Sequence, residues 1–213
     1  RQLLKGASFD LLHMWPIRVA QYVDYFGSMP AVVDYVDCKT MYHRRALETQ
    51  RNPIQWFLNF QEWRKMRRYE VETSRRFAQC ILISEVDKQY LESRGGVSNL
   101  AVVPNGIDLS YFRPMPEYPV EKDSLAFVGT MDVHWNIDAA LFFCRRILPE
   151  VRKEVPGAKL YLVGRNPPSE IKRLAADPRI VVTGEVADIR PFIARAVASV
   201  VPMRVGAGIK NKV

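Results

Sequence analysis

The sequence lacks any apolar run approaching the roughly 18–20 residues that a membrane-spanning helix needs. It also lacks a secretory signal and an initial methionine, so we expect an internal fragment of a longer protein. Cysteine is scarce: Cys38, Cys80 and Cys144 are widely spaced, lie in apolar surroundings and form no C-x-x-C pair. This odd count argues against a disulfide framework or a zinc site and favours buried thiols in a reducing cytosol.

Acidic residues are outnumbered, with 23 aspartates and glutamates against 31 lysines and arginines and a net charge of +8. The excess favours an anionic partner, and nucleotide phosphates, acidic lipid head groups and nucleic acid all fit it. The hydrophobic share of 48% and the charged share of 25% are ordinary for a soluble globular protein. The 213 residues suffice for one large domain or two small ones.

The second half of the chain alternates short apolar runs with amphipathic segments. We expect strands at 124–129, 159–164, 179–184 and 198–203, and helices at 137–154, 168–177 and 188–196. Near-continuous apolar strands that alternate with helices predict a parallel sheet covered on both faces. The first half shows a looser version of the pattern, with strand candidates at 9–13, 31–36, 80–84 and 100–104. Both halves are therefore expected to be α/β.

A long helix is expected between the second and third of these first-half strands, at about 54–77. Its apolar residues Trp56, Phe57, Phe60, Trp63 and Met66 recur at spacings of three and four, which predicts one helix face. Further along, prolines 114, 116 and 119 exclude a regular helix or central strand. We therefore expect an N-terminal domain at 1–108, a linker at 109–122 and a C-terminal domain at 123–213, with a ligand cleft between the domains.

Several segments then occur in a recognisable order: VPNGIDLSYF, FVGTMDVHWNIDAALFF, LYLVG, VVTGEVADIRPFIARA and VVPMRVGAGIKNKV. In this order and spacing the chain resembles the retaining glycosyltransferases of family 4, and within them the exopolysaccharide-type sugar transferases. The resemblance implies an α/β GT-B fold, with two Rossmann-like parallel-sheet domains that face a cleft and are both incomplete in this fragment. It is strongest from about residue 80 onward.

The resemblance also implies an activity. The C-terminal domain would bind a UDP- or GDP-sugar, and the N-terminal domain a saccharide or lipid-linked acceptor. The sugar would be transferred with retention, without a metal or other cofactor, in the biosynthesis of polysaccharide or glycoconjugate. A cytoplasmic, membrane-peripheral protein would follow, with contact to an anionic membrane and none to nucleic acid. The alternatives are a degenerate GT-B module that binds nucleotide sugars without catalysis, and a GT-B nucleotide-sugar epimerase.

The matching positions supply the candidate site. Gly129 and Thr130 would lie at the first strand–helix turn, where a glycine lets the backbone approach a phosphate. His13, the first position of the family's H-x-H, would lie near the transferred sugar, and a core or surface histidine is the alternative. The other candidates for the nucleotide are Gly164, Arg165, Glu185, Val186, Asp188, Gly206 and Gly208. For each of these a purely structural role stays open: a glycine that ends a strand, a surface arginine, or a turn.

The chain also departs from the family pattern. Thr130 and Trp135 stand where an arginine and a lysine usually neutralise the diphosphate. We hypothesise that Lys210, with Arg204 second, supplies the missing charge, because both lie beside the glycines of the closing RVGAGIKNKV segment. The alternative is that they are solvated cations, since lysines on the first turn of a helix oppose its dipole.

Some residues of the first half carry weaker signals. Asp34 and Asp37 lie at the end of a strand, where they would either contact the acceptor or cap the chain end. Ser84 is expected to be a helix N-cap, and His43 is expected on a helix surface. The basic, aromatic segment 63–76 allows three interpretations: a solvated helix face, a contact with an acidic membrane, or nucleic-acid binding. Its glutamates at 62, 70 and 72 interleave with the cations at helical spacing, which favours the solvated face.

Overall fold

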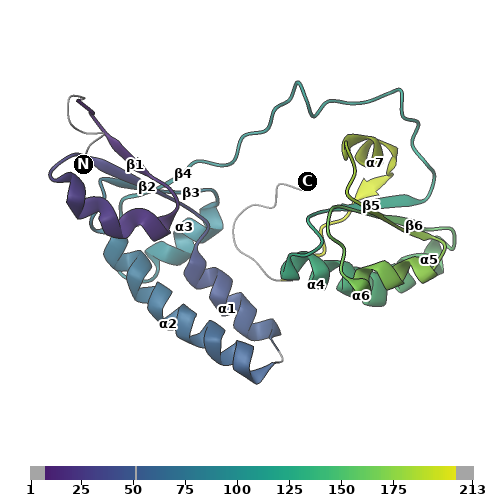
Figure 1. Ribbon diagram of the computed structural model, residues 1–213, viewed down its shortest axis with the longest axis horizontal. Helices are drawn as coiled ribbons and strands as arrows, with labels where there is room; N and C mark the ends of the chain where they lie inside the picture. The colour runs from purple at the N-terminus through teal and green to yellow at the C-terminus, as the bar shows by residue number, and fades with distance from the viewer. Residues whose placement is uncertain (1–7, 51, 205–213) are drawn as a thin grey trace. The chain divides into compact units, whose positions relative to one another are not determined.

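The computed structural model describes residues 8–50 and 52–204 (Figure 1). The chain divides into two compact units, with the boundary between Asn105 and Gly106. Each unit is built around its own parallel sheet, as the alternating pattern predicts. Within the described residues, no helix is both long enough and apolar enough to cross a membrane.

In the described part of the first unit, the sheet has four parallel strands in the order β1-β2-β3-β4. The elements in chain order are β1 Leu12–Met14, the 3-10 helix η1 Ile17–Phe26, β2 Ala31–Val36, α1 Lys39–Thr49, α2 Pro53–Ser74, β3 Gln79–Leu82, α3 Glu85–Glu92 and β4 Leu100–Val102. Alternate residues of β2 are buried, and Ala31, Val33 and Tyr35 lie in one core cluster with residues of η1 and β3. The expected strands are present, although β1 begins and ends later than expected.

The helix α2 begins where its local chemistry dictates. Asn52 accepts hydrogen bonds from the backbone nitrogens of Ile54 and Gln55, at 3.0 and 3.2 Å, and Pro53 occupies the first helical position. Both are favourable at a helix start, because the first N–H groups of a helix have no partner within it. The apolar residues of this helix are not all packed, since Phe57 remains 53% exposed.

Glu70 is also placed differently from the sequence-based interpretation. Its side chain is fully buried and does not belong to the solvated face of α2. The carboxylate accepts hydrogen bonds from the backbone nitrogens of Lys39, at 2.6 Å, and of Thr40, at 3.1 Å, and from the Thr40 hydroxyl. It therefore caps the first turn of α1 from the neighbouring helix, where the local cap residue, Cys38, makes no side-chain cap hydrogen bond.

The second unit has the sheet order β7-β6-β5-β8 in its described residues, and all of these pairings are parallel. Its elements are β5 Ser124–Val128, α4 His134–Phe142, the π-helical turn η2 Phe143–Ile147, α5 Leu148–Glu154, β6 Lys159–Val163, α6 Ser169–Lys172, the 3-10 turn η3 Arg173–Ala176, β7 Ile180–Gly184, α7 Arg190–Arg195 and β8 Ala198–Ser199. The helices α4, α5 and α6 lie on one side of this sheet and α7 on the other (Figure 1).

The helix expected at 137–154 starts earlier, at His134, and contains the π-helical turn η2. Pro149 supplies a physical reason, because it lies at the start of α5 and has no N–H to donate to the preceding turn. The chain passes through a wider turn and resumes the α-helix with proline in its first turn. Leu148, on the inner side, remains buried in the core of the unit.

The segment expected as a linker, 109–122, is attached to the second unit at both ends. The Tyr111 carbonyl accepts a hydrogen bond from the Arg190 guanidinium at 3.0 Å. At the other end, Glu121 forms an ion pair with Lys159 at 2.8 Å and donates its backbone N–H to the Arg195 carbonyl, also at 2.8 Å. The proline-bearing segment is therefore part of the surface of this unit.

Candidate functional site

Three neighbouring strands of the second unit reach the carboxyl edge of the sheet with a glycine. Gly129 follows β5, Gly164 follows β6 and Gly184 ends β7. Their backbones are joined: Gly129 N–H donates to the Val163 carbonyl at 2.9 Å, and Gly164 N–H donates to the Gly184 carbonyl at 3.2 Å. Ligands of open parallel sheets bind outside this edge. The three glycines therefore lie together at the place where such a ligand would bind.

Gly164 is required by its close approach to Gly129. Its φ is +154°, and a Cβ added there would lie 1.8 Å from the Gly129 carbonyl oxygen. No L side chain fits this position without separating the two strand ends. This contact gives the glycine a packing role of its own, and it also leaves bare backbone at the edge of the sheet.

The loop after Gly129 leads into the N-terminus of α4. Asn136 is buried, and its amide donates to the Thr130 carbonyl at 2.8 Å, while Met131 N–H donates to the Arg165 carbonyl at 2.9 Å. These bonds fix the turn against the end of β6. Val133, the N-cap residue of α4, has no side chain that can accept a hydrogen bond. The partial positive charge of this helix end is thus available to an anion rather than to a local cap.

The described cations near these loops differ in their surroundings. Arg165 follows Gly164 and is exposed. Arg204 is held against α4, where its guanidinium Nε lies 3.0 Å from an Asp138 carboxylate oxygen and its central carbon lies 4.5 Å from the centre of the Phe142 ring. The expected charge compensation by Arg204 therefore involves an arginine whose charge is already balanced by Asp138. Asp138 lies 66 residues away in sequence, so no local pattern could reveal this pair.

The loop after β7 contains Glu185, Val186 and Asp188. Asp188 accepts hydrogen bonds from the backbone N–H of Arg190 at 2.9 Å and from its guanidinium at 2.7 and 3.0 Å. These bonds hold the pKa of the Asp188 carboxyl below its usual value. Glu185 is exposed and Val186 is half-buried. Arg190, which the sequence analysis missed, also stacks on Tyr111 at 3.8 Å; the D-x-R spacing was the available signal.

The candidates of the first unit occupy separate places in its sheet. His13 lies inside β1, paired in register with Val32, and its side chain is exposed. Asp34 accepts a hydrogen bond from the Val36 backbone at 2.8 Å, where Val36 has a φ of 65°. Asp37 lies 3.6 Å from Lys39. Each carboxylate therefore has a local partner at the end of β2.

Two minor predictions for the first unit concern its helices. Ser84 caps α3, as expected, and its hydroxyl accepts from Asp87 N–H at 3.4 Å. His43 is half-buried rather than on the free surface of α1, and desolvation lowers its pKa. The three cysteines are free thiols, with Cys38 and Cys80 buried and Cys144 half-buried, and burial raises the pKa of Cys144 to about 11.

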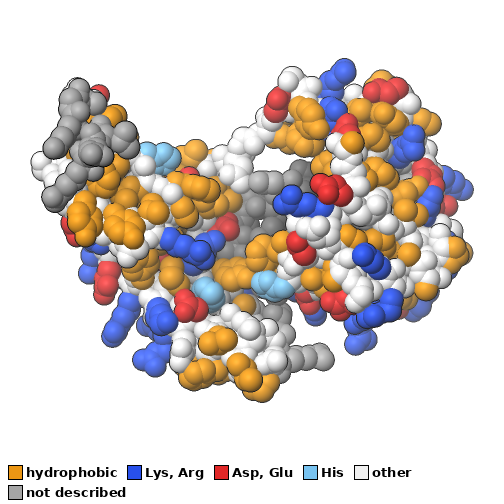
Figure 2. Space-filling view, viewed as in Figure 1, with side chains coloured by type: hydrophobic (Ala, Val, Ile, Leu, Met, Phe, Trp, Pro, Cys, Tyr) orange, Lys and Arg blue, Asp and Glu red, His pale blue; other side chains and the backbone are white. Residues whose placement is uncertain are grey.

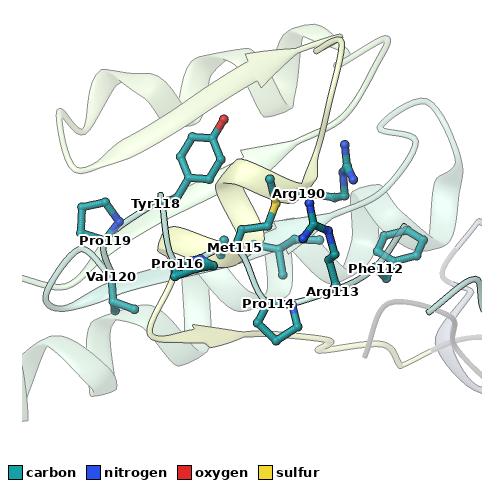
Figure 3. Close-up of a pocket in the computed structure, with 11 residues that line it drawn as sticks. Phe112, Arg113, Pro114, Met115, Pro116, Tyr118, Pro119, Val120 and Arg190 are labelled. Atoms are coloured by element: carbon teal, nitrogen blue, oxygen red, sulfur yellow. The ribbon is translucent and has the colours of Figure 1, made fainter. Parts of the chain in front are cut away.

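A pocket of about 640 Å³ lies in the second unit between residues 112–120 and α7 (Figure 3). Phe112, Pro114, Met115 and Pro116 supply apolar walls, and Arg190 lies at its border. None of the strand-end residues at 129–130 or 164–165 lines it, so it is distinct from the sheet-edge site.

Three predicted residues, Gly206, Gly208 and Lys210, lie outside the described residues. Across residues 8–50 and 52–204, no group of three or more histidine, cysteine, aspartate or glutamate side chains is placed to hold a metal ion. The described part of the site consists of glycine backbone, the N-terminus of α4 and the cations Arg165 and Arg204.

Comparison with known proteins gives a family likeness for the second unit. Residues 122–213 match the family model described as Glycosyl transferases group 1. The matched range begins at the start of the second sheet and includes all three glycine-ended strands. No curated protein matches the chain.

Solved structures extend the likeness to the whole fold. A crystal structure of TarM matches with a TM-score of 0.62 and 11% identity, over 89% of this chain and 35% of that chain. A mutant of S. aureus TarM, crystallised with Fondaparinux, alpha-GlcNAc-glycerol and UDP, matches with a TM-score of 0.54 and 11% identity, over 83% and 33% of the two chains. The chain spans about a third of the length of these structures. The expected α/β fold, GT-B with two parallel-sheet units, is confirmed.

Proposed function

We propose that this chain is part of a retaining glycosyltransferase of family 4, of the exopolysaccharide type. It takes a sugar from a UDP- or GDP-sugar and passes it to a saccharide or lipid-linked acceptor in polysaccharide or glycoconjugate biosynthesis. The observation that carries the proposal is the match to group 1 glycosyltransferases over residues 122–213, which coincides with the glycine-ended strands. The UDP and alpha-GlcNAc-glycerol that were crystallised with the TarM mutant are in line with this donor and acceptor.

The described residues suggest how the donor is held. The N-terminus of α4 and the turn after Gly129 meet the diphosphate, since a glycine at this turn lets the phosphate approach. Lys210, with Arg204, neutralises the charge that develops on the leaving diphosphate, and no metal is required. Because Arg204 is already paired with Asp138, the larger share falls to Lys210. Glu185 and Val186 meet the base, and His13 lies near the transferred sugar. We place this reaction in the cytoplasm.

Binding of the free nucleotide tests the proposal without turnover. UDP and GDP are titrated into the ¹⁵N-labelled chain, and amide shifts are expected at residues 129–131, 164–166 and 184–186. Arg165→Ala is expected to weaken binding several-fold, whereas Arg173→Ala, an exposed arginine of the same unit, leaves it unchanged. Unchanged amide positions at these strand ends with millimolar UDP and GDP would contradict the proposal.

A specific observation favours a second candidate, a GT-B module that binds nucleotide sugars without transferring them. Thr130 and Trp135 provide no charge where the family has an arginine and a lysine, and Asn136 is occupied by its bond to the Thr130 carbonyl. The two candidates differ in one measurement. Incubation of the whole protein with UDP- and GDP-sugars releases the free nucleotide only if transfer or hydrolysis occurs, while the binding module retains the donor intact.

A further inference from the structure

The helices α1 and α2 form a hairpin that extends away from the first sheet, with the two helices side by side (Figure 1). The inner face of α2 is well packed. Met66 and Tyr69 contact the core of the unit, the Tyr69 hydroxyl donates to the Ile17 carbonyl at 3.2 Å, and Glu70 caps α1. The outer face of α2, on the opposite side, packs against neither the core of the unit nor the capped first turn of α1.

The N-terminal end of this outer face is apolar. Ile54 is 74% exposed, Phe57 53% and Leu58 48%, and the last two follow Ile54 at helical spacings of three and four. Trp56 points away from these three residues, is 41% exposed and stacks on Phe60 with ring centres 5.4 Å apart. Figure 2 shows hydrophobic side chains gathered at the far end of the hairpin. Isolated exposed apolar residues are ordinary on protein surfaces, but an exposed cluster of large ones marks an interaction surface.

The same face turns cationic further along the helix. Arg64, Lys65 and Arg68 are exposed and lie on the helical face of Ile54, Phe57 and Leu58, with Gln61 between the two groups. Lys65 contacts Glu62 at 3.1 Å, and Glu72 is the exposed acidic residue at the far end of the face. At about 1.5 Å per residue, the cations follow the apolar cluster by roughly 10 Å or more.

We propose that this face of α2, Ile54, Phe57 and Leu58 followed by Arg64, Lys65 and Arg68, docks onto an anionic lipid bilayer. The apolar end enters the acyl boundary, and the cations meet phosphate groups at the surface. The spacing of the two groups is comparable to the thickness of the interfacial region, which separates the hydrocarbon from water. Phe57 adds an aromatic side chain to the apolar end of this face.

The charge of the surface selects this occupant over a second copy of the chain. In a parallel pair of copies the cations Arg64, Lys65 and Arg68 would repel one another, and in an antiparallel pair they would be set against the apolar cluster of the other copy, whereas an anionic bilayer complements both groups. The docking goes beyond sugar transfer and involves the first unit alone. Its test contains no nucleotide, so the outcome is independent of the donor site.

Vesicle co-sedimentation of the chain tests the proposal. Vesicles of phosphatidylcholine with about one third phosphatidylglycerol are expected to bind the chain, and vesicles of phosphatidylcholine alone to bind it weakly. Each surface cation contributes roughly fivefold to the partition coefficient, so Arg64→Gln/Lys65→Gln/Arg68→Gln is expected to lower it about 100-fold. The matched control Arg145→Gln/Arg146→Gln/Lys172→Gln removes the same charge from exposed positions of the second unit and leaves binding within a few-fold.

A second pair of variants tests the apolar end. Ile54→Gln/Phe57→Gln/Leu58→Gln keeps good helix formers on α2 and is expected to lower the partition coefficient at least tenfold. Val86→Ser/Val103→Ser, at apolar positions with 58% and 54% exposure in the same unit, is the matched control and leaves it unchanged. Far-UV circular dichroism and thermal unfolding of all variants verify that they are folded.

Depth measurement identifies the inserted residues directly, even if one variant unfolds. A chain with Phe57→Trp as its sole tryptophan is expected to be quenched by lipids brominated near the head group, and a chain with only Trp135 is not. Absence of quenching in the Phe57→Trp chain, equal binding of the Gln variants and the parent, or binding that is identical on uncharged vesicles overturns the proposal. So does a lipid-free dimer, seen by light scattering, that the Ile54, Phe57 and Leu58 variant dissociates.

Discussion

In the second unit, three neighbouring strands reach the carboxyl edge of the sheet with bare glycine backbone, whereas β2 and β3 of the first unit end in side chains. β2 is followed by Asp37 and Cys38, and β3 leads to the capping residue Ser84. The close approach of two backbones constrains residue type through sterics, as Gly164 against Gly129 illustrates. A strand end that presents a side chain is under no such constraint, and its residue can change with the ligand. The difference teaches that close-packed glycine backbone fixes residue type more strictly than strand ends that present side chains do, and the unit with the glycine strand ends is the one in the matched range, residues 122–213.

The largest expected effect concerns charge in the donor half of this comparison. We expect Lys210→Ala, in the whole protein, to lower turnover by about 10²-fold or more, because a missing charge on the leaving diphosphate is not replaced. Arg204→Ala is expected to lower turnover less than Lys210→Ala does, since the charge of Arg204 is already paired with Asp138. Steady-state kinetics with the donor measure both, with Lys172→Ala as the control. Near-normal turnover of Lys210→Ala excludes the compensation hypothesis.

The glycines themselves provide the next test. Gly164→Ala is expected to destabilise the second unit by about 3 kcal/mol, because its Cβ would lie 1.8 Å from a backbone oxygen. Gly184→Ala has a φ of +70° but no atom within 4 Å of the added Cβ, so about 1 kcal/mol of backbone strain is expected. Denaturant unfolding of the two variants compares them. Equal losses would show that the close approach of β5 and β6 is not what requires glycine.

In the first unit, the corresponding stability test removes the buried Glu70 carboxylate. Glu70→Ala is expected to destabilise this unit by about 3 kcal/mol, because the first turn of α1 loses several buried acceptor contacts at once. Hydrogen exchange of the Lys39 and Thr40 amides measures the effect locally, and Glu72→Ala, on the exposed side of the same helix, is the control. Slow exchange at both amides in the Glu70 variant would mean that α1 is capped by other means.

The smallest expected effect is a pH dependence confined to the first unit. Desolvation by burial raises the pKa of Glu70 above its ordinary value, against the hydrogen bonds that favour its charged form. The folded chain therefore holds this proton more tightly than the unfolded chain does. The resulting stabilisation is complete below the ordinary pKa and is lost as pH rises through the folded pKa, by at most about 1.4 kcal/mol per pH unit.

Unfolding free energies measured across mildly acidic pH, for the parent and for Glu70→Gln, provide the check. The parent is expected to lose stability with rising pH relative to the variant, which carries no titrating group at this position. Parallel profiles for the two chains would contradict the assignment of this dependence to Glu70.

Much of this architecture could be predicted from the sequence. The apolar runs around Phe127, Leu162 and Val182 form parallel strands as expected, because continuous burial on both faces leaves a plain compositional signal. The π-helical turn before Pro149 and the exposure of Phe57 could not be predicted, since helical periodicity reports spacing but not which face meets a neighbour.

The candidate site divides in the same way. Gly129 and Gly164 were predicted at strand ends, and the structure places them in contact there. The partners of Arg204 and Asp188 were not predicted from the sequence. For Arg204 the reason is distance along the chain, because only the fold brings Asp138 to it. Residues that bond across elements carry no local signature of doing so.

The remote cap of α1 has a consequence for how related sequences can diverge. Because Glu70 supplies the acceptors for the first turn, position 38 is released from the usual demand for serine, threonine, aspartate or asparagine and here holds cysteine. Substitutions at 38 and 70 should therefore be coupled during evolution: a relative that loses the glutamate is expected to regain a capping residue at 38. A helix start of this kind is inherited as a pair of distant positions rather than as a motif.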